Sequence, residues 1–171
     1  MADLLHLWAL APATLGACCV AADRGRARAP ELAASVLMVL AMADAATGAG
    51  LIAPVFWAVL LIAAAMTLAA LRGRRRSGAS HPVPLMAVMT TLGLVVMAAL
   101  TVAMGVHATG HTDGHAHGVG AAGLALGVGA VTAGYVGASG VLAVRGMPRL
   151  DRLQYAAMGA STLLMGLAVL V

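Results

Sequence analysis

The sequence predicts an all-α integral membrane protein built as a bundle of six transmembrane helices. Hydrophobic residues make up 62% of its 171 positions and charged residues only 9%, which is far outside the composition of soluble globular domains. The apolar residues fall in runs of roughly 20, the length that crosses a hydrocarbon core of about 30 Å. Helices are the expected form, because lipid cannot satisfy backbone N–H and C=O groups and the two-residue alternation of barrel strands is absent.

The arginines predict how these helices are oriented. All ten cationic side chains are arginines, and they fall in three short segments between the apolar runs: Arg24, Arg26 and Arg28; Arg72, Arg74, Arg75 and Arg76; and Arg145, Arg149 and Arg152. Cytoplasmic loops collect Lys and Arg, so all three segments are expected on the cytoplasmic side, where they would meet anionic lipid headgroups. Both chain ends and the two remaining loops are then expected outside.

Six spans follow in chain order within a single polytopic domain, residues 1–171. They are expected near Leu4–Ala22, Leu32–Thr47, Pro54–Leu71, Pro84–Val106, Gly118–Val144 and Leu153–Val171. The first has no basic start before its apolar run, so it is expected to stay in the protein rather than be cleaved as a signal peptide. The predicted topology brings Trp8, Phe56 and Trp57 near the outer surface, where amphipathic rings favour the interface.

The second span is the weakest of the six. A central Asp44 would cost about 2.5–3.5 kcal/mol and would cancel the contribution of the Leu and Val residues in this span. Two arginine segments on one side nevertheless require an even number of crossings between them. Since the third span is apolar enough to cross alone, the second must cross too, with Asp44 near its outer end.

The fifth span is rich in glycine. Gly123 and Gly127 form a GxxxG pair, and Ala130, Gly134 and Ala138 continue a row of small residues. Such rows let helix backbones approach closely inside lipid. Two interpretations stay open: the row packs within the bundle, or it forms an interface with another chain or a second copy.

The loop between the fourth and fifth spans is the chemically richest segment. Its polar side chains include His107, His111, Asp113, His115 and His117, all expected on the outer face. Neutral imidazoles in a flexible tract can gather around zinc or copper, with Asp113 as an oxygen ligand or an orienting group. The alternatives are a solvated polar loop without a ligand, and a pH-sensing role, since histidine titrates near neutrality.

The methionines give a second indication of metal binding. Met86, Met89, Met97 and Met104 lie within one stripe of the fourth span, which ends in His107. Others occur on the second, third and sixth spans: Met38, Met42, Met66, Met158 and Met165. Thioethers are soft ligands suited to Cu(I), and Met42, Met104, Met165 and His107 could meet in the outer half of the bundle. The alternative is that methionine, an adaptable side chain, fills gaps in an Ala/Gly-rich core.

The order of these features resembles a known group of proteins. A Met-rich second helix (residues 31–43) follows an arginine segment, and an arginine-rich inner loop and a Met-rich fourth helix come next. A His/Gly outer loop, a Gly-rich fifth helix with Gly134-Tyr135 and a sixth helix with paired methionines complete the order. In this respect the chain resembles actinobacterial multi-pass membrane proteins grouped as a domain family of unknown function. The resemblance covers nearly the whole chain and implies a bacterial plasma-membrane protein, without supplying an activity.

The chain also departs from that group. Its members often place histidine beside the Met runs, whereas here Ser35 precedes Met38, and Gln154 and Tyr155 precede Met158. These departures weaken any metal site carried over to the second and sixth helices.

The remaining features bear on the class of function. The chain has no Ser/His/Asp arrangement in a recognisable context, no phosphate-cradling loop and no paired inward carboxylates, which predicts a non-enzymatic protein. Its net charge of +4 comes from arginines that flank apolar spans, and aromatic residues are few, so nucleic acid is not an expected partner. Two hypotheses follow: an accessory or assembly subunit that uses the fifth helix, and a copper or zinc handling protein whose loop histidines capture metal that Met104 and Met42 receive.

Overall fold

The computed structural model describes residues 2–22, 29–76, 85–109, 121–145 and 148–170. These segments form six helices: α1 (Ala2–Ala22), α2 (Ala29–Thr47), α3 (Pro54–Arg76), α4 (Leu85–Thr109), α5 (Ala121–Val144) and α6 (Arg149–Leu170). The described segments contain no strand, so the prediction of an all-helical fold is confirmed. α3 continues past the predicted end at Leu71, because arginine is a good helix former and helical hydrogen bonding does not stop where the apolar run stops.

Five of the helices, α1 to α5, are long and apolar enough to cross a membrane. Such lengths and compositions are those of a multi-pass membrane protein. α6 is not among these candidate spans, and its first turn carries Arg149, Asp151 and Arg152 ahead of an apolar run. Many outward side chains are large and apolar, including Phe56 and Leu126, as suits a surface that faces lipid.

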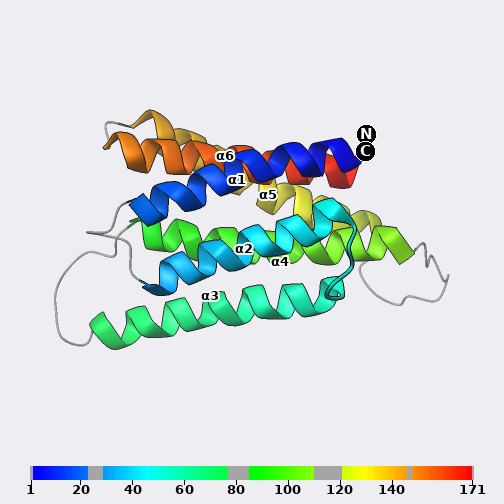
Figure 1. The fold of residues 1–171 in the computed structure, drawn as a ribbon, viewed down its shortest axis with the longest axis horizontal. Coiled ribbons are helices and arrows are strands. Elements are labelled where there is room, and N and C mark those ends of the chain that lie inside the picture. Colours follow the sequence, from blue (N-terminus) through cyan, green and yellow to red (C-terminus); the bar gives the residue numbers. More distant parts are fainter. Residues whose placement is uncertain (1, 23–28, 77–84, 110–120, 146–147, 171) are drawn as a thin grey trace.

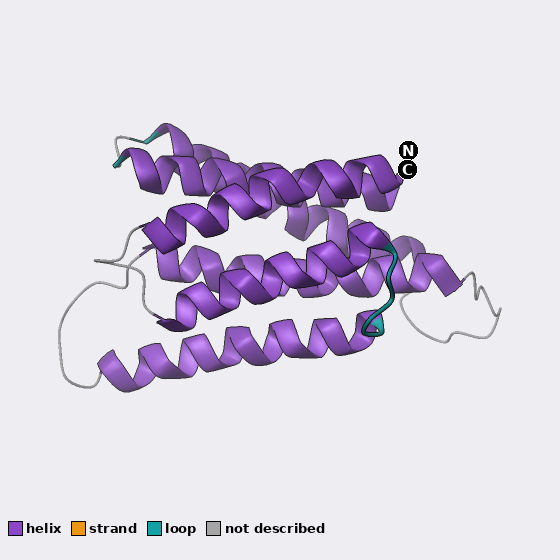
Figure 2. Cartoon of the chain, viewed as in Figure 1, coloured by secondary structure: helices purple, strands orange, loops and turns teal. Residues whose placement is uncertain are grey.

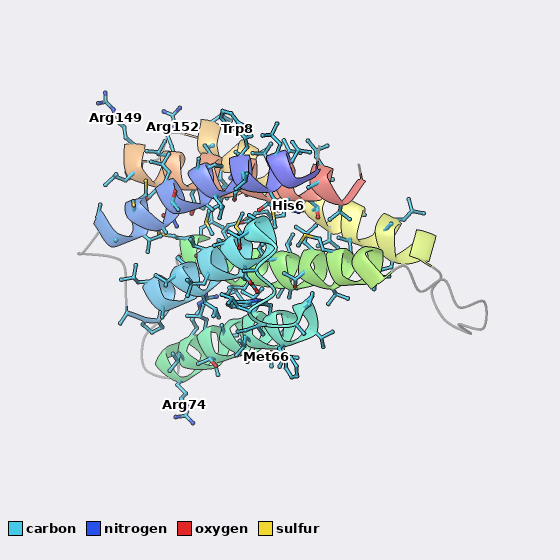
Figure 3. The ribbon with its side chains drawn as sticks, turned by 45° about the vertical axis from the view of Figure 1, so that its right-hand side comes forward. His6, Trp8, Met66, Arg74, Arg149 and Arg152 are labelled. Atoms are coloured by element: carbon cyan, nitrogen blue, oxygen red, sulfur yellow. The ribbon has the colours of Figure 1, made fainter. Side chains whose placement is uncertain are left out.

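The helices run up and down along one long axis (Figure 1). Both chain ends and the connection from α2 to α3 lie at one end of the bundle, called here the N/C end. α1, α3 and α5 end at the opposite end, where α2, α4 and α6 begin. Figure 3 labels Arg74, Arg149 and Arg152 there, and this is called the arginine end. The helices therefore alternate in direction, with these three arginines gathered away from the chain ends.

The helices are packed unevenly around one core. The first and last helices, α1 and α6, form the most extensive contact, while α3 packs mainly on α4 and α5 packs mainly on α6. Large apolar side chains that are at most 1% exposed include Met42, Leu61, Leu94, Leu100 and Met165. The centre is thus built from leucine and methionine, with alanine filling the narrower contacts.

Close approach between helices depends on glycines outside the predicted row. Those with a neighbouring side chain in contact with a built Cβ position are Gly16, Gly93, Gly105, Gly159 and Gly166. A Cβ at Gly166 would lie 2.9 Å from Thr132 Cγ2, and one at Gly159 would lie 3.1 Å from Ser139 Cβ. α5 and α6 are antiparallel, so the same kind of contact between a glycine of α6 and a hydroxyl side chain of α5 occurs twice, about two helical turns apart. The glycines that bring α5 and α6 together therefore belong to α6.

Asp44 closes the corner between α2 and α3, the described connection that Figure 2 draws as loop. Its carboxylate accepts hydrogen bonds from the backbone N–H groups of Leu51 (2.9 Å) and Ile52 (3.3 Å) and from the indole N–H of Trp57 (2.7 Å). Asp44 is buried, and an unpaired buried charge is costly, so these three donors make its position tolerable. Gly48, with φ of 61°, supplies a backbone conformation that only glycine adopts readily.

The same corner determines the exposure of one aromatic residue. Trp57 is only 8% exposed, because its indole N–H is drawn inward to Asp44, whereas Trp8 and Phe56 are 64% and 65% exposed. Trp57 is therefore a core residue, while the location of the three rings near the outer membrane surface stays a prediction.

Two arginines at the arginine end tie helices together. The Arg72 guanidinium on α3 donates hydrogen bonds to the Ala87 carbonyl and to the Thr91 hydroxyl on α4. Arg152 Nε on α6 donates to the Ala143 carbonyl in the last turn of α5, at 2.7 Å. The long apolar stem of arginine lets its charged head reach a helix end in this way. Part of the arginine pattern that predicts topology thus also holds neighbouring helices in place.

Candidate functional site

The predicted metal-binding loop lies mostly outside the described residues. His111, Asp113, His115 and His117 all belong to residues 110–120, of which the structure describes nothing. The backbone of His107 continues α4, which ends at Thr109, but its side chain is also outside the described set. The loop as a metal-capturing segment therefore stays a prediction.

A histidine and a methionine meet at the N/C end of the bundle. His6 Nε2 on α1 lies 3.2 Å from Met104 Sδ on α4, and both side chains are part-buried. Figure 3 shows His6 on the side of α1 that faces the rest of the bundle. Imidazole nitrogen and thioether sulfur are both ligands for soft or borderline metal ions. Met104, one of the predicted metal residues, thus lies against another potential ligand.

The other methionines are mostly in the core. Met38, Met42, Met97, Met158 and Met165 are each at most 5% exposed and belong to one cluster of buried side chains, against which Met89 and Met104 also pack. Burial among alanine and leucine is what methionine as an adaptable filler would show. Met66, labelled in Figure 3, is instead 67% exposed on α3. Within the described part of the chain, no three His, Cys, Asp or Glu side chains group where they could hold a metal ion.

The predicted small-residue row on α5 faces open space. A Cβ built at Gly127 or Gly134 meets no atom within 4 Å, and the same holds at Gly137 and Gly140. Gly123 and Ala130 are exposed as well. In contrast, the opposite side of α5 buries Thr132, Tyr135 and Ser139 against α4 and α6. Gly127 and Gly134 therefore make no close contact at the Cβ position within the described bundle, although Ala138 in the same row is half-buried. The row leaves a smooth, narrow strip of helix surface that is open at these two glycines.

A cavity of about 390 Å³ lies beside this helix, between α4, α5 and α6. Its lining includes Leu100 from α4, Gly129, Thr132 and Gly137 from α5, and Leu163 and Leu167 from α6. The lining is apolar except for Thr132, whose hydroxyl has no hydrogen-bond partner. Such a cavity has the size of a small-ligand pocket and suits hydrocarbon or an apolar side chain.

Thr132 differs from other threonines of the bundle. The hydroxyls of Thr90, Thr101 and Thr162 each donate to a backbone carbonyl three or four residues earlier in the same helix. Thr132 instead places its methyl group against Gly166. Its side-chain orientation therefore serves the contact with α6 rather than its own hydrogen bonding.

Comparisons with known proteins add no assignment. No protein-family model matches the chain, and neither the curated proteins nor the solved structures gave a match. The resemblance to the actinobacterial family, which rests on the order of features along the chain, therefore stays a prediction.

Sequence reasoning left His6 without a role. The sequence pattern alone pairs it with no other side chain. The signal that could have found the pair is topological: alternating helices bring the beginning of α1 and the end of α4 to the same end of the bundle. What the sequence could not show is which faces of these two helices meet there.

Proposed function

We propose that this chain is a non-enzymatic, six-span protein of a bacterial plasma membrane that acts as an accessory or assembly subunit. Both chain ends and the His-rich loop would lie outside the cell, and the arginine end would face the cytoplasm and its anionic headgroups. The alternating helices and the arginines at one end support this orientation. The partner would be another membrane chain, or a second copy, docked against α5.

The observation that carries this proposal is the open glycine strip of α5. Inside a membrane, helix association is driven by close packing and by interhelical hydrogen bonds, since lipid is as apolar as the helix surface. The strip of Gly127, Gly134 and Ala138 offers close approach, and no neighbouring helix of the described bundle uses its glycines. A helix laid against this strip would gain packing that lipid chains supply less well.

The test is affinity purification of the full chain from its native membrane in mild detergent. Gly127→Leu should abolish recovery of a stoichiometric partner while leaving the thermal stability of the purified protein unchanged. Gly73→Leu on α3 is the matched control, because that glycine is also exposed with nothing within 4 Å of its Cβ position. Recovery of the same partner by the Gly127→Leu protein would contradict the proposal, and so would a wild-type protein that is monomeric in lipid nanodiscs and recovers nothing.

A second candidate function is the handling of copper or zinc. The contact between His6 and Met104 favours it, because α4 leads from this contact directly toward the His-rich tract. In this proposal His107, His111, His115 and His117, with Asp113, capture metal outside, and Met104 and Met42 receive it. Imidazole ligands suit zinc and copper, and thioethers suit Cu(I), so copper passed from the loop to the methionines would be Cu(I) at both places, with no change of oxidation state.

This second function is tested by equilibrium binding of Cu(I), Cu(II) and Zn(II) to purified protein in detergent. Wild type is compared with a variant in which the four loop histidines are alanine. Stoichiometric binding that disappears in the variant supports capture by the loop. No binding by wild type above a detergent blank would remove metal handling from consideration.

A further inference from the structure

We propose that His6 and Met104 form a binding pair for a monovalent soft metal ion, Cu(I), inside the N/C end of the bundle. This inference rests on the second proposed function, metal handling, and adds to it a ligand and a choice of ion. His6 comes from α1 and Met104 from α4, so the pair joins two helices that are far apart in sequence.

The separation of the two donor atoms suits a shared ion. Zinc bonds of about 2.1 Å to histidine nitrogen and about 2.3 Å to cysteine sulfur, meeting at a roughly tetrahedral angle, place the donors about 3.6 Å apart, and a Cu(I) ion that keeps further ligands would need a similar separation. His6 Nε2 and Met104 Sδ are 3.2 Å apart. A small outward rotation of one side chain would therefore admit the ion, without movement of either helix. Both side chains are part-buried, so the site is neither sealed in the core nor fully open.

The chemistry of the pair selects the charge and softness of the ion. A thioether is neutral and binds soft ions, and a metal-bound imidazole is also neutral, so neither ligand offsets the charge of the ion. Transferring charge into an apolar surrounding is costly and becomes more so with a divalent ion. The buried cluster against which Met104 packs consists mainly of Ala, Leu and Met side chains, with two valines, one tryptophan and one tyrosine. Cu(I), which is soft and carries one charge, fits this pair better than Zn(II) or Cu(II).

The pair also has a defined place along α4. Met104 lies one turn before His107, where the His-rich tract begins, and Met97 lies about two turns deeper and is 1% exposed. The pair is thus the first soft site on the way from the loop into the bundle. No change of oxidation state is needed, because Cu(I) would arrive and bind as Cu(I).

The experiment measures Cu(I) binding to the full chain in nanodiscs under a reducing atmosphere, with Ag(I) as a redox-inert monovalent probe. All measurements use the variant with the four loop histidines changed to alanine, which leaves the pair as the site under test. We expect one ion per chain in this background. His6→Phe and Met104→Leu should each weaken binding by at least about tenfold, the lower end of the loss seen when even an outer-shell partner of a metal site is removed. Met66→Leu, at an exposed methionine, is the matched control and should change nothing.

X-ray absorption of the bound copper gives a readout that does not depend on stability. We expect one sulfur scatterer in the loop variant, lost in Met104→Leu and retained in Met66→Leu. If the loop variant binds no Cu(I) while wild type does, or if sulfur is absent from the spectrum, the pair is not a site, although metal handling by the loop stands. If wild type binds no metal, both proposals fall.

Discussion

α5 and α6 each carry glycines, but among the positions that the structure describes fully, only those of α6 have a neighbouring side chain close to the built Cβ position. Gly159 and Gly166 accept Ser139 and Thr132 at van der Waals distance or closer, while Gly127 on α5 meets nothing. The same residue type thus serves contact on one helix and leaves an open strip on the other. A row of small residues therefore indicates where two helices can approach closely. It does not indicate whether the second helix belongs to the same chain.

The largest loss of stability is expected when a large side chain replaces a packed glycine of α6. Gly166→Leu should destabilise the protein by about 3 kcal/mol, since the added side chain must displace Thr132 and α5 with it. Gly127→Leu should leave stability nearly unchanged. SDS titration of detergent-solubilised protein, followed by helical circular dichroism, measures both. Equal losses of stability at the two positions would contradict the conclusion that α6 packs through its glycines and α5 does not.

A double-mutant cycle sharpens the comparison at one contact. Gly166→Ala places a Cβ 2.9 Å from Thr132 Cγ2, a methyl on a stiff β-branched side chain that cannot swing away freely. Alone it should destabilise by about 1–2 kcal/mol, and Thr132→Ser, which deletes that methyl, should recover about 1 kcal/mol of this. The same titration gives the coupling energy. An additive cycle would mean that the two side chains do not oppose each other in the membrane.

A small gain of stability is expected when a methyl group is added to the open strip of α5. Gly127→Ala should stabilise the isolated chain by about 0.4–1 kcal/mol, because the unfolded chain loses conformational freedom and no atom of the folded bundle obstructs the new methyl. Thermal unfolding in detergent checks the sign, with Gly73→Ala as the companion on α3. Destabilisation at Gly127 would show that a neighbour covers it.

The smallest changes of stability are expected when threonine hydroxyl groups are removed. Thr132→Val keeps the shape that contacts Gly166 and removes a hydroxyl without a partner, so stability should be unchanged or slightly improved. Thr162→Val removes a hydrogen bond to the Met158 carbonyl and should cost about 0.5–1 kcal/mol. Thermal unfolding of the two variants side by side tests the order; the reverse order would mean that Thr132 has a hydrogen-bond partner in the membrane.

The helices themselves could be predicted from sequence, because the thickness of the bilayer sets their length and lipid enforces the helical form. The position of Asp44 in the last turn of α2 also followed from cost alone, since a charged side chain in mid-span would oppose insertion. Both predictions depend only on the position of each residue along the chain, and not on the neighbours that it contacts in the fold.

The contacts could not be predicted in the same way. A soluble helix shows its buried face by its apolar residues, but in lipid the outer face is apolar too. Nothing along the chain therefore distinguishes Met97, which is 1% exposed, from Met66, which is 67% exposed. The burial of Trp57 and the meeting of His6 with Met104 depend on helix rotation, which the hydrophobic pattern leaves undetermined.

The pairing of the first helix with the last has a consequence for biogenesis. Ribosomes make α1 before α2 to α5, yet its most extensive neighbour, α6, is made after them. Until α6 is made, the side of α1 that packs on it has no such neighbour. A chain that stops before Arg149 would leave this face of α1 without its neighbour. We expect proteases that remove incomplete membrane proteins to recognise the exposed face.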